Sequence, residues 1–189
     1  MGRLILITGG ARSGKSSFAE KLAGEMARSG TGEGPVAPVV YIATCIPGDD
    51  EMRQRVENHK IRRPSHWKTV EEPLDLAGAL KREGTGSRVV LVDCLGLYVT
   101  NLFCQEAADT PQNDRCHDVL GAVREVAGAA RDVPAHVIVV SNEVGMGLVP
   151  EYPLGRLFRD ALGWANQILA EASDQVYFMV SGIPVAVKP

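Results

Sequence analysis

Residues 9–16 combine the glycines and polar side chains best suited to bind nucleotide phosphates. They read Gly9-Gly10-Ala11-Arg12-Ser13-Gly14-Lys15-Ser16, which fits the pattern G-x-x-x-x-G-K-[ST]. Glycines let the backbone curl so that several N–H groups point at one anion. Lys15 supplies a mobile cation for the β- and γ-phosphates, and Ser16 offers a hydroxyl oxygen to Mg²⁺. The pattern predicts a phosphate site that includes a magnesium ion.

A second candidate metal ligand, Asp93, follows the apolar run Val89-Val90-Leu91-Val92. In phosphate-loop enzymes an acid at the carboxyl end of a buried strand orients Mg²⁺, directly or through water. An aspartate in this position could also simply cap a helix. Because the phosphate loop precedes it, we favour the metal-binding role for Asp93.

A charged segment over residues 51–67 contains five lysines and arginines and two histidines around one proline. A solvated charged helix is the ordinary explanation of such a segment. However, cations beside an imidazole keep it neutral and nucleophilic, and they offset the charge of a transferred phosphate. His59, which is followed by Lys60, is therefore a candidate phosphoryl or nucleotidyl acceptor, and residue types alone leave both alternatives open.

The elements that must position these residues are short apolar runs that alternate with helical patterns. Strands are expected at residues 4–7, 39–43, 88–92, 137–140 and 176–180, with an antiparallel edge strand at 185–187. Helices are expected at residues 16–29, 49–59, 74–82, 119–131 and 154–172, and loops at 31–38 and 109–114. The alternation predicts an α/β fold in which helices flank a mostly parallel sheet.

The phosphate loop lies where this fold needs it, between the first strand and the first helix. That helix begins near Lys15 and shows an apolar face at Phe18, Leu22 and Met26. Its N-terminus adds a partial positive charge to the phosphate site. The arrangement predicts a P-loop NTPase fold formed by one domain over residues 1–189.

Bulk composition excludes several other classes of protein. The net charge of −3 and the 5% content of aromatic residues do not suit a nucleic-acid binder, which needs a basic surface or stacking platforms. No apolar run is long enough to span a bilayer or to form a signal peptide, so we expect a cytoplasmic protein. The four cysteines lack CxxC spacing, which argues against a zinc site. Cys45 and Cys94 lie in or beside apolar runs and are expected to be reduced, buried thiols.

Two other kinds of P-loop protein, regulatory GTPases and small-molecule kinases, carry a phosphate loop of this type. Residues 93–96 fit the D-x-x-G motif of a regulatory GTPase, but the guanine-reading N-K-x-D motif is missing. The nearest candidate, residues 142–145, lacks both the lysine and the aspartate. A GTP-binding switch is therefore disfavoured, whereas a monofunctional small-molecule kinase stays open because its fold and loop would look the same.

Strings along nearly the whole chain resemble the bifunctional adenosylcobinamide kinase / adenosylcobinamide-phosphate guanylyltransferase family of cobalamin biosynthesis. The most specific are residues 7–16 (ITGGARSGKS) together with 141–150 (SNEVGMGLVP). Others are residues 41–44 (YIAT), 50–52 (DEM), 59–60 (HK), 63–64 (RP), 67–73 (WKTVEEP), 99–102 (VTNL), 156–160 (RLFRD) and 166–167 (NQ).

This resemblance implies two activities. The chain would phosphorylate adenosylcobinamide with ATP or GTP, and would then transfer GMP from GTP to that phosphate through a covalent histidine–GMP. His59 occupies the position of that histidine, and Lys15 is the second catalytic residue. With Gly9, Gly10, Ala11, Arg12, Ser13, Gly14, Lys15 and Ser16, the nucleotide site would include Thr44, Cys45, Arg63, Pro64 and Glu71. Mg²⁺ would bind at Ser16 and Asp93.

The chain departs from some relatives at two of these positions. Some members carry two adjacent histidines where this chain has Asn58-His59, which leaves His59 in register and His66 as the fallback. Some have glutamate where this chain has Asp93. The resemblance also implies a homo-oligomer, with a trimer among the expected forms, and a corrinoid site that is open or shared between subunits.

Overall fold

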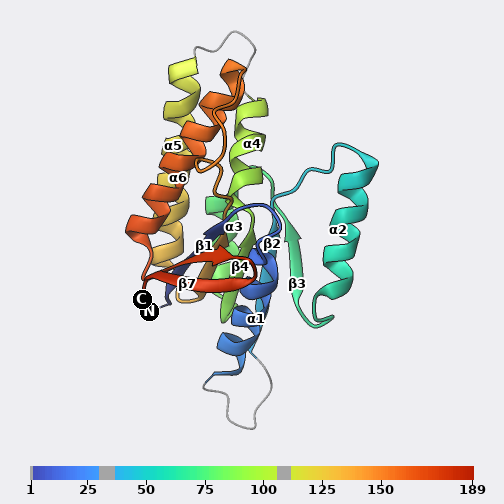
Figure 1. Ribbon diagram of the computed structural model, residues 1–189. Helices are drawn as coiled ribbons and strands as arrows, with labels where there is room; N and C mark the ends of the chain where they lie inside the picture. Colours follow the sequence, from blue (N-terminus) through green and yellow to red (C-terminus); the bar gives the residue numbers. More distant parts are fainter. Residues whose placement is uncertain (1, 30–36, 106–111) are drawn as a thin grey trace.

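A seven-stranded sheet with strand order β3-β2-β4-β5-β1-β6-β7 forms the centre of the protein (Figure 1). The computed structural model describes residues 2–29, 37–105 and 112–189. The strands are β1 (Leu4–Gly9), β2 (Val39–Ala43), β3 (Lys68–Glu71), β4 (Val89–Asp93), β5 (His136–Val140), β6 (Gln175–Val180) and β7 (Ile183–Lys188).

Strands β1 to β6 pair in parallel, and β7 pairs antiparallel to β6 at the edge. β1 lies between β5 and β6, so the loop that follows β1 emerges from the middle of the sheet. Parallel strands collect their carboxyl ends at one edge of a sheet, which is where α/β proteins bind ligands. The predicted mostly parallel α/β sheet with an antiparallel edge strand is confirmed.

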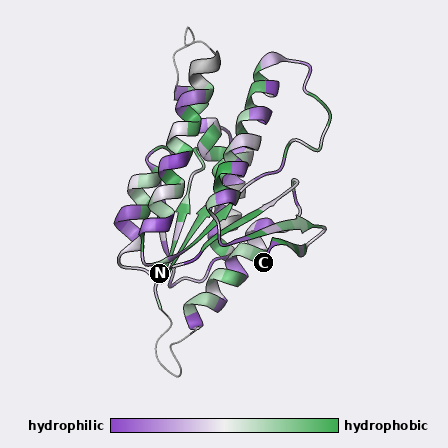
Figure 2. Cartoon of the chain, turned by 90° about the vertical axis from the view of Figure 1, so that its left-hand side faces the viewer, coloured by the Kyte–Doolittle hydropathy of each residue, from purple (hydrophilic) through white to green (hydrophobic). Residues whose placement is uncertain are grey.

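Helices cover both faces of the sheet, and a further helix, α2 (Asp50–Arg62), lies beside its β3 edge (Figure 1). The others are α1 (Lys15–Arg28), α3 (Leu76–Gly84), α4 (Leu95–Gln105), α5 (Gln112–Asp132) and α6 (Pro153–Ala172). Side chains alternate along β1, so that Leu4 and Leu6 pack with α3 to α6, whereas Ile5 and Ile7 face α1. The central strands β1, β2, β4 and β5 are therefore buried and apolar on both faces, and the middle of the sheet is mostly hydrophobic in Figure 2.

Two elements escaped prediction because each lacks the expected periodicity. β3 has the sequence Lys-Thr-Val-Glu and is largely exposed beside β2, so it contains no apolar run. α4 is apolar around most of its circumference, and a buried helix of this kind has no polar face to reveal its period. The expected loop at 109–114 was wrong in its last part, since α5 begins at Gln112; its first part and most of the loop at 31–38 lie outside the described residues.

α2 begins where its sequence predicts and lies beside β3, apart from the helices that cover the sheet (Figure 1). The Asp49 carboxylate accepts a hydrogen bond from the Met52 N–H at 2.8 Å, which caps the helix. Lys60 Nζ lies 3.1 Å from Glu71 Oε1 and so joins the helix to β3. The cap stabilises the start of α2, and the ion pair connects its last turns to β3, the edge strand of the sheet.

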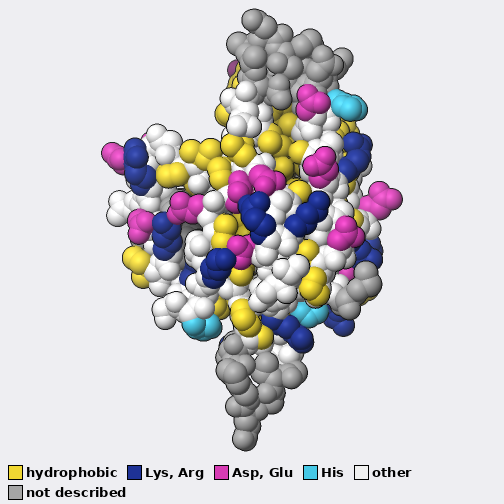
Figure 3. Space-filling model, turned by 180° about the vertical axis from the view of Figure 1, so that it is seen from behind, with side chains coloured by type: hydrophobic (Ala, Val, Ile, Leu, Met, Phe, Trp, Pro, Cys, Tyr) yellow, Lys and Arg dark blue, Asp and Glu magenta, His cyan; other side chains and the backbone are white. Residues whose placement is uncertain are grey.

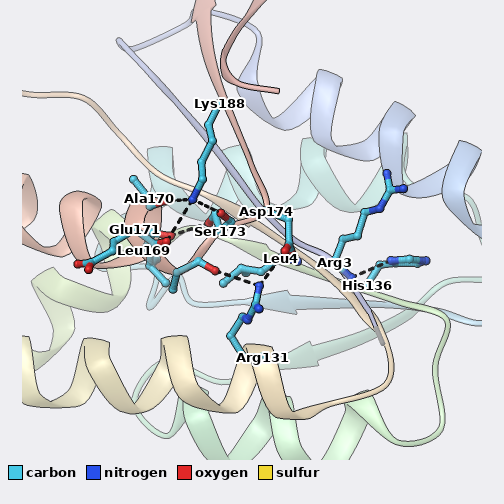
Figure 4. Close-up of polar contacts among 11 residues, drawn as sticks. Arg3, Leu4, Arg131, His136, Leu169, Ala170, Glu171, Ser173, Asp174 and Lys188 are labelled. Carbon is cyan, nitrogen blue, oxygen red and sulfur yellow. Dashed lines mark hydrogen bonds and ion pairs between the residues drawn. The ribbon is translucent and has the colours of Figure 1, made fainter.

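Side chains hold the start of β1 from both neighbouring strands (Figure 4). His136 Nδ1 accepts the Arg3 N–H at 3.0 Å, and Asp174 Oδ2 accepts the Leu4 N–H at 2.7 Å. The hydrogen bond from Leu4 and that from Arg131 hold the pKa of Asp174 below its usual value, despite partial burial. Burial, with Arg88 and Arg3 nearby, lowers the pKa of His136.

We expect the free energy of unfolding to fall as the pH drops from 7 to 5. Since the pKa of His136 is lower in the folded state, the unfolded chain binds the proton first. The contribution of neutral His136 to the free energy of unfolding is therefore complete above the ordinary histidine pKa of about 6.5. It is lost as the pH falls from there through the lower pKa of the folded state. His136→Gln should flatten this part of a urea-unfolding profile measured against pH. His117→Gln, which changes an exposed histidine, should leave the profile unchanged.

No helix in the described ranges is both long and apolar enough to cross a membrane. On the face turned away in Figure 1, acidic and basic side chains are interspersed with apolar ones (Figure 3). This mixed surface agrees with the small net charge of −3.

Candidate nucleotide-binding site

Two glycines at the loop between β1 and α1 have positive φ values and pack closely against the C-terminal part of the chain. Gly9 and Gly14 have φ values of 150° and 93°. A Cβ on Gly14 would lie 3.1 Å from the Gly182 Cα, and one on Gly9 would lie 2.7 Å from the Met179 carbonyl oxygen. The loop therefore packs against the β6–β7 turn, where the Gly182 N–H donates to the Ser13 carbonyl at 2.9 Å.

Lys15 is the first residue of α1, and its side chain lies back over the loop. Only 8% of the residue is exposed, and Nζ donates a hydrogen bond to the Gly10 carbonyl at 2.6 Å. Within the described ranges, the buried Ser13 hydroxyl has no hydrogen-bond partner. A buried cation, a helix N-terminus and an unsatisfied hydroxyl together form a site suited to an anion with several oxygens.

A cavity of about 610 Å³ opens beside this loop. Residues from the loop and the first turn of α1 form one wall, and the carboxyl ends of β2, β4 and β5 form the floor. Met52 and Arg63, at the two ends of α2, complete it. The cavity therefore connects the predicted phosphate site with the charged helix.

Asp93, Tyr41 and Arg63 form a connected group on this floor. The Tyr41 hydroxyl donates to Asp93 Oδ2 at 2.8 Å. The Arg63 Cζ atom lies 3.3 Å from the centroid of the Tyr41 ring, a cation–π contact. Arg63 Nη1 also approaches Thr69 Oγ1 at 3.5 Å. Arg63, the residue just after α2, is thereby connected through Tyr41 to Asp93, the last residue of β4.

Burial sets the protonation of two neighbouring groups. Burial raises the pKa of Tyr41 far above its ordinary value, and the Asp93 carboxylate raises it further, so the hydroxyl stays protonated and donates to Asp93. Burial also raises the pKa of Cys94 to about 12, with a smaller contribution from Asp93. Cys94 therefore remains a thiol at neutral pH and is no nucleophile.

Most of the predicted nucleotide-site residues meet in this cavity. Those that line it are Ala11, Arg12, Ser13, Gly14, Lys15, Ser16, Cys45, Arg63 and Asp93. Gly9 and Gly10 shape the loop without lining the cavity. Thr44 is fully buried, and its hydroxyl bonds both the N–H and the carbonyl of Cys94. Pro64 and Glu71 are exposed beside α2, outside the cavity lining.

His59 belongs to the last turns of α2, four residues before Arg63. Its side chain lies outside the described part of the structure, so its role as the nucleophile stays a prediction. The fallback, His66, is exposed and precedes the buried Trp67.

Several cavity residues were not assigned from the sequence, among them Tyr41, Met52, Leu97 and Val140. Tyr41 was read only as part of a buried strand, although a buried tyrosine needs a partner for its hydroxyl. Asn142 also lines the cavity. Its carbonyl accepts a hydrogen bond from Asn166 Nδ2 at 3.0 Å, and Asn166 Oδ1 accepts from Ser141.

The fold and the loop define a P-loop NTPase-like protein: a strand from the middle of a parallel sheet, a glycine-rich turn and a helix that begins with lysine and serine. Residues 5–187 match the family model of cobinamide kinase / cobinamide phosphate guanyltransferase. The chain belongs to this family.

Curated relatives match over nearly their whole length. The chain is 45% identical to the bifunctional adenosylcobalamin biosynthesis protein CobP of Pseudomonas aeruginosa, over 97% of this chain and 96% of the relative. It is 40% identical to the bifunctional adenosylcobalamin biosynthesis protein CobU of Escherichia coli, over 98% of this chain and 99% of the relative. The CobU protein of Salmonella typhimurium is equally similar, with 40% identity over 98% of this chain.

Proposed function

We propose that this protein phosphorylates adenosylcobinamide with ATP or GTP and then transfers GMP from GTP to the new phosphate, giving adenosylcobinamide-GDP. The observation that carries the proposal is the cavity that joins the phosphate loop, Asp93 and the end of α2. A nucleotide triphosphate bound in this cavity would lie against the phosphate loop and beside α2, the helix that carries His59. Membership of the family and relatives named as bifunctional proteins support the same conclusion.

In the kinase step, a hydroxyl of adenosylcobinamide attacks the γ-phosphorus and the nucleoside diphosphate leaves. The N–H groups of the loop and the N-terminus of α1 bind the phosphates. Lys15 exchanges its hydrogen bond with Gly10 for the phosphate oxygens and offsets the charge that develops on them.

The residues of the cavity suit a magnesium ion. Ser16 contributes a hydroxyl and Asp93 a carboxylate, both of them hard oxygen donors in one cavity lining. Mg²⁺ takes few protein ligands and completes its shell with phosphate oxygens and water. When bound, it would neutralise charge on the β- and γ-phosphates.

In the transfer step, an imidazole nitrogen of His59 would attack the α-phosphorus of GTP, and pyrophosphate would leave. The substrate phosphate would then attack the histidine–GMP, breaking the P–N bond and releasing the imidazole. Two displacements replace one difficult reaction. Lys15 and Arg63 line the cavity and can offset the charge in both displacements, with Lys60 and Arg62 on the same helix as His59.

The corrin macrocycle would lie outside the cavity, because a cavity of about 610 Å³ that holds a nucleotide triphosphate has no room for a second large ligand. Only the arm that carries the hydroxyl would enter. The homo-oligomer implied by the resemblance stays a prediction, as does a corrinoid site shared between subunits.

Incubation of the protein with adenosylcobinamide, GTP and Mg²⁺ tests this function. We expect adenosylcobinamide phosphate to appear first and adenosylcobinamide-GDP with pyrophosphate to follow, as resolved by chromatography. Product that stops at the phosphate would indicate a monofunctional kinase. GTP hydrolysis without any corrinoid product would overturn the proposal altogether.

A further inference from the structure

Tyr41 lies where it can serve both ends of the cavity. It is in the middle of β2 and only 2% exposed, and it pairs in register with Leu91 of β4 and Thr69 of β3. Asp93 is two residues after Leu91, so it lies on the same face of the sheet and diagonally opposite Tyr41. The register of the sheet therefore brings the phenol to the carboxylate.

Arg63 lies over the ring of Tyr41, next to β3. Thr69 is the neighbour of Tyr41 on β3, and the Arg63 guanidinium lies over the ring while Nη1 approaches the Thr69 hydroxyl. Arg63 Nε is buried and has no hydrogen-bond partner among the described residues. Because Arg63 also lines the cavity, its guanidinium is held at the wall against which a nucleotide phosphate would bind.

A packing role alone does not explain this choice of residue. Phenylalanine would fill the same space in β2 without burying a hydroxyl, which requires a partner in a core. Here the partner is a cavity carboxylate. A carboxylate held through one oxygen keeps a fixed orientation, and such fixed orientation is what a metal-orienting acid requires.

We propose that Tyr41 is a positioning residue for both steps: its hydroxyl orients the Asp93 carboxylate toward Mg²⁺, and its ring seats the Arg63 guanidinium against the nucleotide phosphates. The inference rests on the proposed function only in assigning Asp93 to the metal and Arg63 to the phosphates. It needs no corrinoid to be tested.

Tyr41→Phe separates the two roles because it keeps the ring and removes the hydroxyl. Calorimetric titration with GTP, with and without Mg²⁺, should give an unchanged affinity for GTP alone. The gain in affinity that Mg²⁺ confers should shrink about tenfold, as for a lost hydrogen bond to a charged group. Tyr98→Phe, equally buried but outside the cavity lining, is the matched control and should match the wild type.

The role of the Tyr41 ring in seating Arg63 is tested by a double-mutant cycle that measures GTP binding without Mg²⁺. Tyr41→Leu and Arg63→Ala should each weaken binding, and the double variant should bind no more weakly than Arg63→Ala alone, because both changes remove one contact. Additive losses would overturn the role of the ring. A Mg²⁺ gain that is unchanged in a folded Tyr41→Phe would overturn the role of the hydroxyl. If the wild type binds Mg²⁺·GTP but makes no corrinoid product, the proposed function fails while these binding results still decide the role of Tyr41.

Discussion

Lys15→Met should lower turnover in both steps by about 10²–10³-fold, the usual cost of removing one donor that stabilises charge in a transition state. The lysine is buried against the loop, and its ammonium is held 2.6 Å from the Gly10 carbonyl. Methionine preserves the length of the side chain and suits a buried position. The loss should therefore come from the missing charge and not from a collapsed loop. Steady-state assays of corrinoid phosphate and of pyrophosphate measure the two steps.

Lys21→Met provides the matched control on the same helix. Lys21 is exposed and only 3.9 Å from Glu25 in a surface pair, so its loss should change neither step measurably. The thermal unfolding midpoint of Lys15→Met should stay close to that of the wild type. Wild-type turnover in Lys15→Met would mean that the nucleotide phosphates bind elsewhere, and the proposed site would have to be abandoned.

The phosphate loop could be predicted in detail because its residue types and their spacing are local requirements. Gly14 must adopt a positive φ, and a pattern of consecutive residues records such a demand; its contact with Gly182 is long-range and was not predicted. The same holds for the buried strands, whose apolar runs are visible in the sequence. β4 and the acid at its end needed no knowledge of the neighbouring strands.

Other parts of the site depend on contacts between distant residues. Tyr41 meets Asp93 only because β2 pairs with β4 in one register. Asn101, in the unpredicted α4, donates to the carbonyls of Thr44 and Pro73 at 2.7 and 3.1 Å and so fixes the end of β2. No pattern of neighbouring residues encodes these pairs, since strand order and register are set by the packing of the whole sheet.

His59→Ala should abolish the covalent adduct and reduce transfer of GMP by at least about 10³-fold, in line with the large losses that follow removal of a covalent nucleophile. Incubation with α-labelled GTP should label the wild type, and the label should be labile in acid and stable in base, as expected for a phosphoramidate. His59→Ala should bind GTP normally and should retain kinase turnover, because the hydroxyl of the substrate attacks the γ-phosphorus without help from an adduct.

His66→Ala distinguishes the two histidines of the segment. His66 is exposed after the end of α2, so its replacement should leave the label in place. A labelled His59→Ala together with an unlabelled His66→Ala would move the nucleophile to His66.

A comparison of His59→Ala with Lys15→Met also tests whether one cavity serves both reactions. If it does, Lys15→Met impairs both steps whereas His59→Ala impairs only the second, since the loop binds the triphosphate in each step and the nucleophile acts at the α-phosphorus alone.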